Sequence, residues 1–291
     1  MPARINRVIE LLEQGQPVYY TGVPEVSYEA GLAAVQTWAD YLNVELEHGA
    51  FDMGALDAFM RGLVDGGPTR SGHRTPAVIV TLPTDGTDEH VMRANAWMVK
   101  QVLARGVHGI LLCHAETPAA VKVFVESARY PFHTLGVGQG LDQGRRGSGG
   151  QGHAAAIWGV SVAEYLDRAD VWPLNPNGEL LLGLKIENRR ALENAELSTR
   201  VPGIAFAEWG PGDMGMSFGW KDAHDPPYPP EMEAARARVK AACDAAGIAF
   251  LNGVTPENVV QMIDEGVKIC STRSREAADI GRRYTGRTLP V

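Results

Sequence analysis

The sequence lacks any cluster of lysines and arginines, and its formal net charge at pH 7 is −8. Nucleic-acid binding depends on basic patches that neutralise phosphates, so this balance argues against a nucleic-acid partner. The densest basic point in the glycine-rich middle of the chain is the pair Arg145-Arg146, and two residues do not form a patch. We therefore expect no nucleic-acid partner.

Cysteines are also scarce, because the chain has only three, at positions 113, 243 and 270, and no CxxC pair. A sparse, odd set argues against a disulfide framework and for a reducing compartment. No apolar run approaches the ~18 residues that a membrane-spanning helix needs. Residues 1–15 favour a short helix, since they lack the apolar core and cleavage site of a signal peptide. We expect a cytoplasmic protein with no membrane partner.

Strand and helix patterns alternate along the whole chain. Residues 77–81 and 109–113 are continuous apolar runs, typical of buried parallel strands, and Ser27 and Asp52 stand where N-caps open helices. The eight predicted strands are 17–21, 42–46, 77–81, 109–113, 180–186, 203–208, 248–251 and 267–271. This count and the length of 291 residues predict one α/β domain, a (β/α)8 TIM barrel over residues 1–291. A doubly wound open sheet is the alternative, but it usually has fewer strands.

One segment, about residues 131–178, breaks the alternation and is rich in glycine. We predict an insertion whose aromatic residues Trp158 and Trp172 shape a substrate pocket or a subunit interface; a purely structural loop is the alternative. Residues 136–141 resemble a dinucleotide-binding fingerprint only superficially, because the third glycine and the preceding strand are missing. Nucleotide binding is therefore not predicted.

In a barrel of this type, chemistry takes place at the carboxyl ends of the strands. The polar residues at those positions are Glu45, Glu47, His48, Thr81, Asp85, His114, Glu116, Lys185, Glu187, Glu208, Asp213, Asn252, Ser271 and Arg273. So many carboxylates in one place repel one another unless a cation lies among them. Glu187 and Asp213 follow two consecutive strands, and hard divalent cations prefer such oxygen ligands. We predict that these two bind a metal; the alternative is that each caps or begins a helix.

The segment 210–215 (GPGDMG) has small residues before a helical turn, which leaves backbone N–H groups free to bind a carboxylate. A 2-oxo acid would suit both features, because its keto and carboxylate oxygens can chelate a metal while its other carboxylate oxygen faces the amides. His48 follows the second strand, where a near-neutral imidazole could move a proton. The alternative for His48 is a histidine hydrogen-bonded at a strand end.

Three short segments carry a resemblance to a known family: 46–49 (LEHG), 186–191 (IENRRA) and 210–213 (GPGD). With these segments, nearly the whole chain resembles the HpcH/HpaI aldolases. These are metal-dependent class II pyruvate aldolases, which share a barrel superfamily with citrate lyase β-subunits. The resemblance implies homohexamers, arranged as trimers of dimers, in which the last helix is exchanged between subunits.

The resemblance also implies roles for individual residues. Glu187 and Asp213 would ligate Mg²⁺, Mn²⁺ or Co²⁺, and His48 would act as the acid/base. The amides of Gly212 and Asp213 would bind the pyruvate carboxylate. The implied reaction is a metal-dependent C–C lyase reaction, which cleaves or forms a 4-hydroxy-2-oxo acid through a pyruvate enolate and an aldehyde.

The chain departs from the family pattern at two strand ends. Thr81 stands where the family usually has an arginine that polarises the keto oxygen, and Lys185 stands where it commonly has a glutamine. Our hypothesis is that Lys185 supplies the catalytic positive charge missing at Thr81; retained activity in Lys185→Gln would refute it. Glu208 is also unexpected beside the metal loop. We expect it to be either a further metal ligand or a contact for water or substrate.

Three alternative functions remain open from the sequence. A CoA-ester lyase of the citrate lyase β type would share the barrel and the acidic pair, and a 2-oxo acid decarboxylase would use the same enolate. A non-catalytic barrel that binds a metal and an acid is the third. A requirement for CoA separates the first of these from an aldolase, and metal-dependent turnover separates the enzymes from the non-catalytic barrel.

Overall fold

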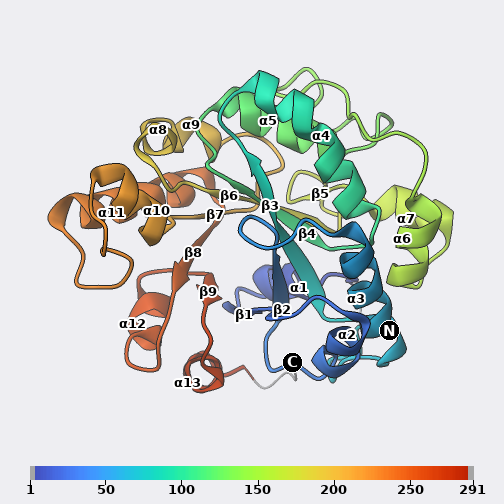
Figure 1. Ribbon diagram of the computed structural model, residues 1–291, viewed down its shortest axis with the longest axis horizontal. Helices are drawn as coiled ribbons and strands as arrows, with labels where there is room; N and C mark the ends of the chain where they lie inside the picture. Colours follow the sequence, from blue (N-terminus) through green and yellow to red (C-terminus); the bar gives the residue numbers. More distant parts are fainter. Residues whose placement is uncertain (1–3, 288–291) are drawn as a thin grey trace.

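The computed structural model describes residues 4–287, and within them eight parallel strands close into a barrel (Figure 1). The closure comes from β1 pairing with both β2 and β9, and from β4 pairing with β6. The barrel strands are β1 (Val18–Gly22), β2 (Tyr41–Glu45), β3 (Ala77–Asp85), β4 (Gly109–Cys113), β6 (Leu180–Lys185), β7 (Phe206–Glu208), β8 (Ala249–Gly253) and β9 (Ile269–Ser271). The predicted (β/α)8 barrel is confirmed, and the alternative prediction of an open doubly wound sheet is wrong.

Helices surround the barrel, and the predicted caps hold: Ser27 accepts the N–H of Ala30, and Asp52 accepts that of Gly54. The helices are α1 (Arg7–Glu13), α2 (Tyr28–Ala34), α3 (Met53–Asp65), α4 (Glu89–Leu103), α5 (Pro118–Ala128), α6 (Gln151–Trp158), α7 (Val162–Arg168), α8 (Arg189–Glu193), α9 (Ala195–Ser198), α10 (Pro211–Phe218), α11 (Pro230–Ala246), α12 (Val259–Asp264) and α13 (Arg275–Tyr284). In the described part of the chain, none of them has the length and apolarity needed to cross a membrane.

Two predicted elements differ in detail from the structure. The helix expected over 188–200 is two short helices, α8 and α9, which meet at Asn194. The strand expected from residue 203 begins at Phe206, because Gly203 has a φ of +96°, a left-handed conformation that cannot continue a strand. Neither difference moves the carboxyl end of β6 or β7, which is where the candidate site lies.

The apolar core has two layers, one inside the barrel and one between the barrel and its helices. Inside, alternate strand residues such as Tyr41, Ile79 and Leu181 pack together with α1, which contributes Val8 and Leu11. The amino-terminal end of the barrel is therefore filled by apolar side chains. The side chains with metal-ligand atoms that converge, Glu47, His114, Glu187 and Asp213, lie toward the carboxyl ends of the strands, which makes that end the candidate site.

The segment 131–178 is not simply a loop, because α6, α7 and the short strand β5 (Val171–Trp172) lie within it. β5 pairs with the beginning of β6, and the buried Trp158 donates its indole N–H to the carbonyl of Gly106, 2.9 Å away and just before β4. Both tryptophans therefore lie at the amino-terminal end of the barrel. The expectation that they shape the substrate pocket is wrong; a role in a subunit interface stays a prediction.

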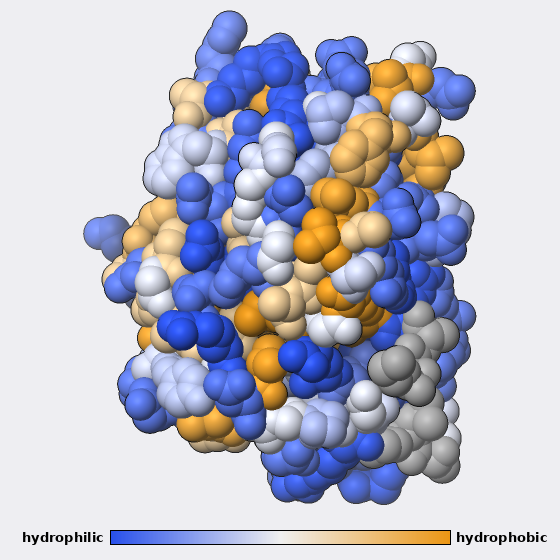
Figure 2. Space-filling model, turned by 90° about the vertical axis from the view of Figure 1, so that its right-hand side faces the viewer, coloured by the Kyte–Doolittle hydropathy of each residue, from blue (hydrophilic) through white to orange (hydrophobic). Residues whose placement is uncertain are grey.

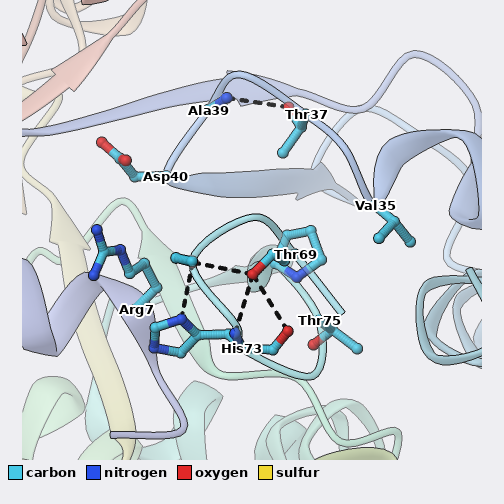
Figure 3. Close-up of a pocket in the computed structure, with 10 residues that line it drawn as sticks. Arg7, Val35, Thr37, Ala39, Asp40, Thr69, His73 and Thr75 are labelled. Atoms are coloured by element: carbon cyan, nitrogen blue, oxygen red, sulfur yellow. Dashed lines mark hydrogen bonds between the residues drawn. The ribbon is translucent and has the colours of Figure 1, made fainter. Parts of the chain in front are cut away.

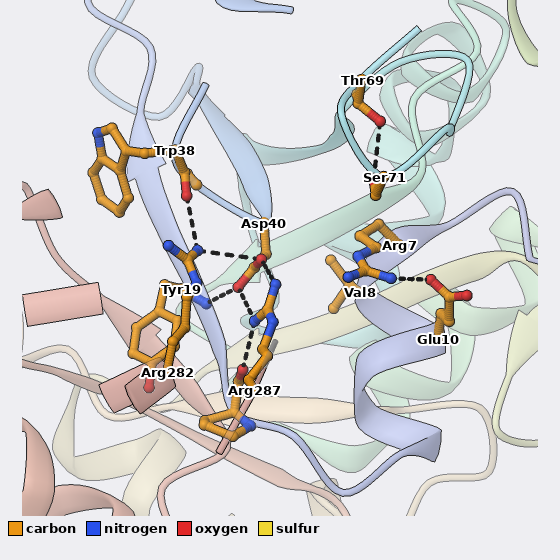
Figure 4. A network of polar contacts seen from close by, with 12 residues as sticks. Arg7, Val8, Glu10, Tyr19, Trp38, Asp40, Thr69, Ser71, Arg282 and Arg287 are labelled. Carbon is orange, nitrogen blue, oxygen red and sulfur yellow. Dashed lines mark hydrogen bonds and ion pairs between the residues drawn. The ribbon is translucent and has the colours of Figure 1, made fainter. Parts of the chain in front are cut away.

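The last helix, α13, is seated on its own barrel (Figure 4). The buried carboxylate of Asp40 forms ion pairs with Arg282 of α13 and with Arg287 just beyond it. The same carboxylate accepts the N–H of Tyr19 in β1 at 2.9 Å, and Arg282 also donates to the carbonyl of Trp38 at 2.8 Å. This cluster holds the end of the chain against β1, and the exchange of the last helix between subunits stays a prediction.

Candidate active site

Four side chains with ligand atoms converge at the carboxyl end of the barrel. Glu47 follows β2, His114 follows β4, Glu187 follows β6, and Asp213 lies in the first turn of α10. One nitrogen or oxygen atom from each lies within 4.8 Å of the others. The structure therefore brings together the two predicted metal ligands, Glu187 and Asp213, and adds Glu47 and His114 to them.

The ammonium group of Lys185 lies between two of these carboxylates. Its Nζ is 2.6 Å from Glu47 Oε2 and 3.0 Å from Glu187 Oε2. Because β6 points alternate residues into the barrel, Lys185 and Glu187 face the same interior space. The predicted catalytic lysine is thus part of the carboxylate cluster.

Glu187 is fully buried, and the local backbone is shaped around its carboxylate. Oε1 accepts the backbone N–H of His114 at 3.0 Å, whereas Oε2 has no hydrogen bond. Gly210 lies against this side chain: a Cβ at that position would be 2.5 Å from Oε2 of Glu187. A buried carboxylate oxygen without a hydrogen bond is costly unless a cation or a ligand group approaches it, and here the Lys185 ammonium is that cation.

His114 is held in an unusual conformation. Its φ is +43°, the left-handed region that side chains other than glycine seldom adopt, and it is the one such residue besides glycines between residues 4 and 287. Its Nδ1 is 3.2 Å from the side-chain Nδ2 of Asn188, and the same Nδ2 also donates to Glu116. Strain of this kind concentrates at functional sites, and here it directs the imidazole toward Glu47 and Glu187.

The pKa values follow from the crowding of carboxylates around one cation. Burial raises the pKa of Glu208 to about 7, reinforced by Glu187 and Glu47 and opposed by Lys185. Burial lowers the pKa of Lys185, but the carboxylates of Glu187 and Glu208 outweigh this effect and raise it. Burial also raises the pKa of Glu47, yet the contact with Lys185 prevails and lowers it. Lys185 is therefore a firmly charged ammonium among acids.

The remaining predicted residues lie around this cluster. Thr81 is buried in the barrel and donates its hydroxyl to Asn43 Oδ1 at 3.1 Å, so it supplies no positive charge. The His48 side chain is 73% exposed, with Nε2 3.9 Å from Glu47 Oε2. It therefore lies at the solvent side of the cluster, where an incoming second substrate would meet it.

The glycine loop presents amides at the same end of the barrel. Pro211 and Gly212 open α10 after Gly210, which offers no side-chain cap. The amides of Gly212 and Asp213 have no acceptor among the residues that the structure describes, as expected for the first turn of a helix. These amides are available for an anion, as the sequence predicts.

The donor set fits a divalent cation. Three carboxylates and one imidazole stand close enough to share an ion, and the buried Oε2 of Glu187 already has a cation, Lys185, 3.0 Å away. Oxygen ligands suit Mg²⁺ and Mn²⁺, and an added imidazole also suits the later transition metals. The residues that would hold the ion are Glu187 and Asp213, with Glu47 and His114 beside them.

Sequence reasoning did not assign a role to Glu47 or His114, although both were among the strand-end residues. The signal was their position directly after β2 and β4. What the sequence could not show is that the backbone at His114 turns left-handed and donates to Glu187. That contact joins residues 73 positions apart and exists only once the barrel closes.

We expect Gly210→Ala to weaken metal binding at least about 10-fold, because the new methyl group would collide with the Glu187 carboxylate and its Cβ. Isothermal titration of metal-stripped protein with Mn²⁺ measures the effect. Gly212→Ala is the matched control, since its methyl group would meet only Cδ2 of the exposed His224, at 3.1 Å. Equal Mn²⁺ affinities in the two variants would contradict this account.

Two hollows lie at the opposite, amino-terminal end. One, of about 10 Å³, is lined by Arg7, Thr69 and His73, and the Thr69 hydroxyl accepts the backbone N–H of His73 (Figure 3). The other, of about 440 Å³, is lined by residues that include His108 and Trp158. Figure 2 views the molecule from the side of α6 and α7, where apolar residues gather between charged ones. Neither hollow includes a residue of the carboxylate cluster.

Comparison with known proteins agrees with this geometry. Residues 73–272 match the model of the HpcH/HpaI aldolase/citrate lyase family. A solved HpcH/HpaI aldolase/citrate lyase family protein from Burkholderia cenocepacia J2315 superposes with a TM-score of 0.72, at 22% identity, over 98% of each chain. At 22% identity, this superposition supports a shared fold and nothing more.

Two curated relatives are named as aldolases. The 2-keto-3-deoxy-L-rhamnonate aldolase of Klebsiella pneumoniae is 32% identical over 54% of this chain and 52% of its own length. The chain thus spans about half the length of that relative. The hydroxypyruvate/pyruvate aldolase of Paraburkholderia phytofirmans is 25% identical over 84% of this chain and 81% of its own length. The names of both relatives refer to 2-oxo acids.

Proposed function

Because the chain belongs to the HpcH/HpaI aldolase/citrate lyase family, we propose that it is a metal-dependent aldolase that joins or separates a pyruvate-like 2-oxo acid and an aldehyde. The observation that carries the proposal is the convergence of Glu187, Asp213, Glu47 and His114 within 4.8 Å, beside the free amides of α10. Two relatives named as aldolases, for rhamnonate-derived and hydroxypyruvate substrates, support the same reaction class.

Each residue has a role that its position supports. Glu187 and Asp213 would hold the divalent ion, and the amides of Gly212 and Asp213 would orient the 2-oxo acid through its carboxylate. The ion, when bound, supplies positive charge for the enolate oxygen. Lys185 would place a second positive charge near the same oxygen, since Thr81 offers none.

Proton transfer is assigned to His48. It lies at the exposed side of the cluster, where an aldehyde would enter, and it can take a proton from the hydroxyl group when the C–C bond breaks and return it when the bond forms. Glu47 Oε2 lies 3.9 Å from its Nε2, so the imidazole adjoins the carboxylate cluster.

The preferred ion and the assembly belong to this proposal as well. Mg²⁺, Mn²⁺ and Co²⁺ all suit the ligands, and a homohexamer is the arrangement that the family resemblance implies. All three cysteines are free and buried, which is compatible with the expected cytoplasmic location. Sedimentation of the purified protein would test the assembly.

We expect the metal-stripped protein to leave the methyl protons of pyruvate unchanged in D₂O, and to exchange them for deuterium once Mg²⁺, Mn²⁺ or Co²⁺ is added. This exchange requires formation of the enolate, and the test needs no knowledge of the aldehyde. Proton NMR of the methyl signal measures it, with metal alone as the control. No exchange with any of the three ions would contradict the proposal and favour the CoA-ester lyase or the non-catalytic barrel.

A further inference from the structure

We propose that Lys185 is a tethered cation that competes with the divalent metal for Glu47 and Glu187, so that tight metal binding requires the anionic substrate to draw the lysine away. The inference rests on the proposed function, because it takes Glu187 as a metal ligand and a 2-oxo acid as the substrate. It goes further by making the binding of metal and of substrate depend on each other.

The first step of the argument is geometric. Lys185 Nζ lies 2.6 Å from Glu47 and 3.0 Å from Glu187, which are two of the four residues that can share a metal. Its contact on Glu187 is with Oε2, the same oxygen that has no hydrogen bond. An ammonium group at this position takes up space and charge that a metal ion would otherwise have.

The second step is electrostatic. The Lys185 side chain is 12% exposed and that of Glu187 is fully buried, so water screens their charges little. A divalent ion beside the same carboxylates would repel the ammonium group strongly at such a short distance. The lysine must therefore move when the ion binds, and the loss of its two ion pairs opposes metal binding.

The third step concerns where the ammonium group can go. In the part of the chain that the structure describes, no arginine forms an ion pair with Glu47 or Glu187, and Thr81 offers only a hydroxyl group. The lysine is thus a flexible cation, already inside the site, that can meet the negative oxygens of a 2-oxo acid. When an anion binds, Lys185 forms a new ion pair with it in place of those with Glu47 and Glu187. The anion therefore promotes metal binding.

The test measures metal affinity and not activity. Metal-stripped wild-type protein and Lys185→Met are titrated calorimetrically with Mn²⁺, with and without saturating oxalate, a planar dianion that resembles the enolate of pyruvate. Without oxalate, we expect Lys185→Met to bind Mn²⁺ at least about 10-fold more tightly than wild type. Oxalate should strengthen Mn²⁺ binding by a larger factor in wild type than in the variant. Lys240→Met, which removes a surface lysine paired with Asp244, is the matched control.

The outcomes separate this inference from the proposed function. If both proteins bind Mn²⁺ with the same affinity, or the variant binds it more weakly, Lys185 does not compete and the inference is overturned while the metal site stands. If neither protein binds Mn²⁺, the metal site itself fails and both proposals fall. Circular dichroism spectra that match wild type would show that Lys185→Met is folded, and Lys185→Gln provides a second variant if it is not.

Discussion

Glu187→Gln is expected to abolish metal-dependent exchange of the pyruvate methyl protons and to weaken Mn²⁺ binding by more than about 100-fold. Changes to groups that only support metal ligands cost about 10- to 100-fold in affinity, and Glu187 is placed as a direct ligand. The substitution keeps the shape of the side chain, and its amide oxygen can still accept the N–H of His114. It removes the negative charge that both the metal and Lys185 require.

Calorimetric titration with Mn²⁺ and proton NMR of pyruvate in D₂O measure the two effects. Glu116→Gln is the control, because Glu116 lies at the same edge of the barrel and accepts a hydrogen bond from Asn188 but is not one of the four converging donors. We expect the control to keep Mn²⁺ affinity within about 10-fold of wild type. A Glu187→Gln protein that binds Mn²⁺ normally would remove Glu187 from the metal site.

The parts of this site that follow strand periodicity were predictable. An apolar run that ends in an acidic residue places that residue at the carboxyl end of a strand, and this rule located Glu187 and Glu208 correctly at the ends of β6 and β7. The start of α10 near Asp213 was equally predictable, since a glycine precedes a proline in the first turn of the helix there. Both signals are local, within about ten residues of the side chain concerned.

Contacts across the barrel were not predictable in the same way. Lys185 and Glu47 are 138 positions apart, and their 2.6 Å contact depends on how eight strands close and on which residues then face inward. Sequence reasoning treated Lys185 as a replacement for an arginine, whereas the structure shows that it also contacts the carboxylates of the predicted metal site. The long segment 131–178 misled for a related reason: its tryptophans were predicted to line the pocket, but the pairing of β5 with β6 and the contact of Trp158 with Gly106 place them at the other end.

Asp40→Asn is expected to cause a large loss of stability, although it lies outside the site. The carboxylate of Asp40 is fully buried and pairs with Arg282 and Arg287, whose side chains are only 9% and 1% exposed. Removal of its charge leaves the buried guanidinium group of Arg287 without its counter-ion and leaves Arg282 with only the half-exposed Asp279. Breaking a buried ion pair in this way typically costs about 3–5 kcal/mol.

The midpoint of urea unfolding, followed by circular dichroism, measures this loss. Asp279→Asn is the matched control: Asp279 also contacts Arg282, at 3.4 Å, but it is 39% exposed. An exposed partner of this kind is worth at most about 1 kcal/mol, so its midpoint should barely move. Equal shifts in the two variants would mean that Asp40 does not anchor α13. A large shift in Asp40→Asn alone would show that this buried cluster, and with it the docking of α13 against β1, is needed for stability.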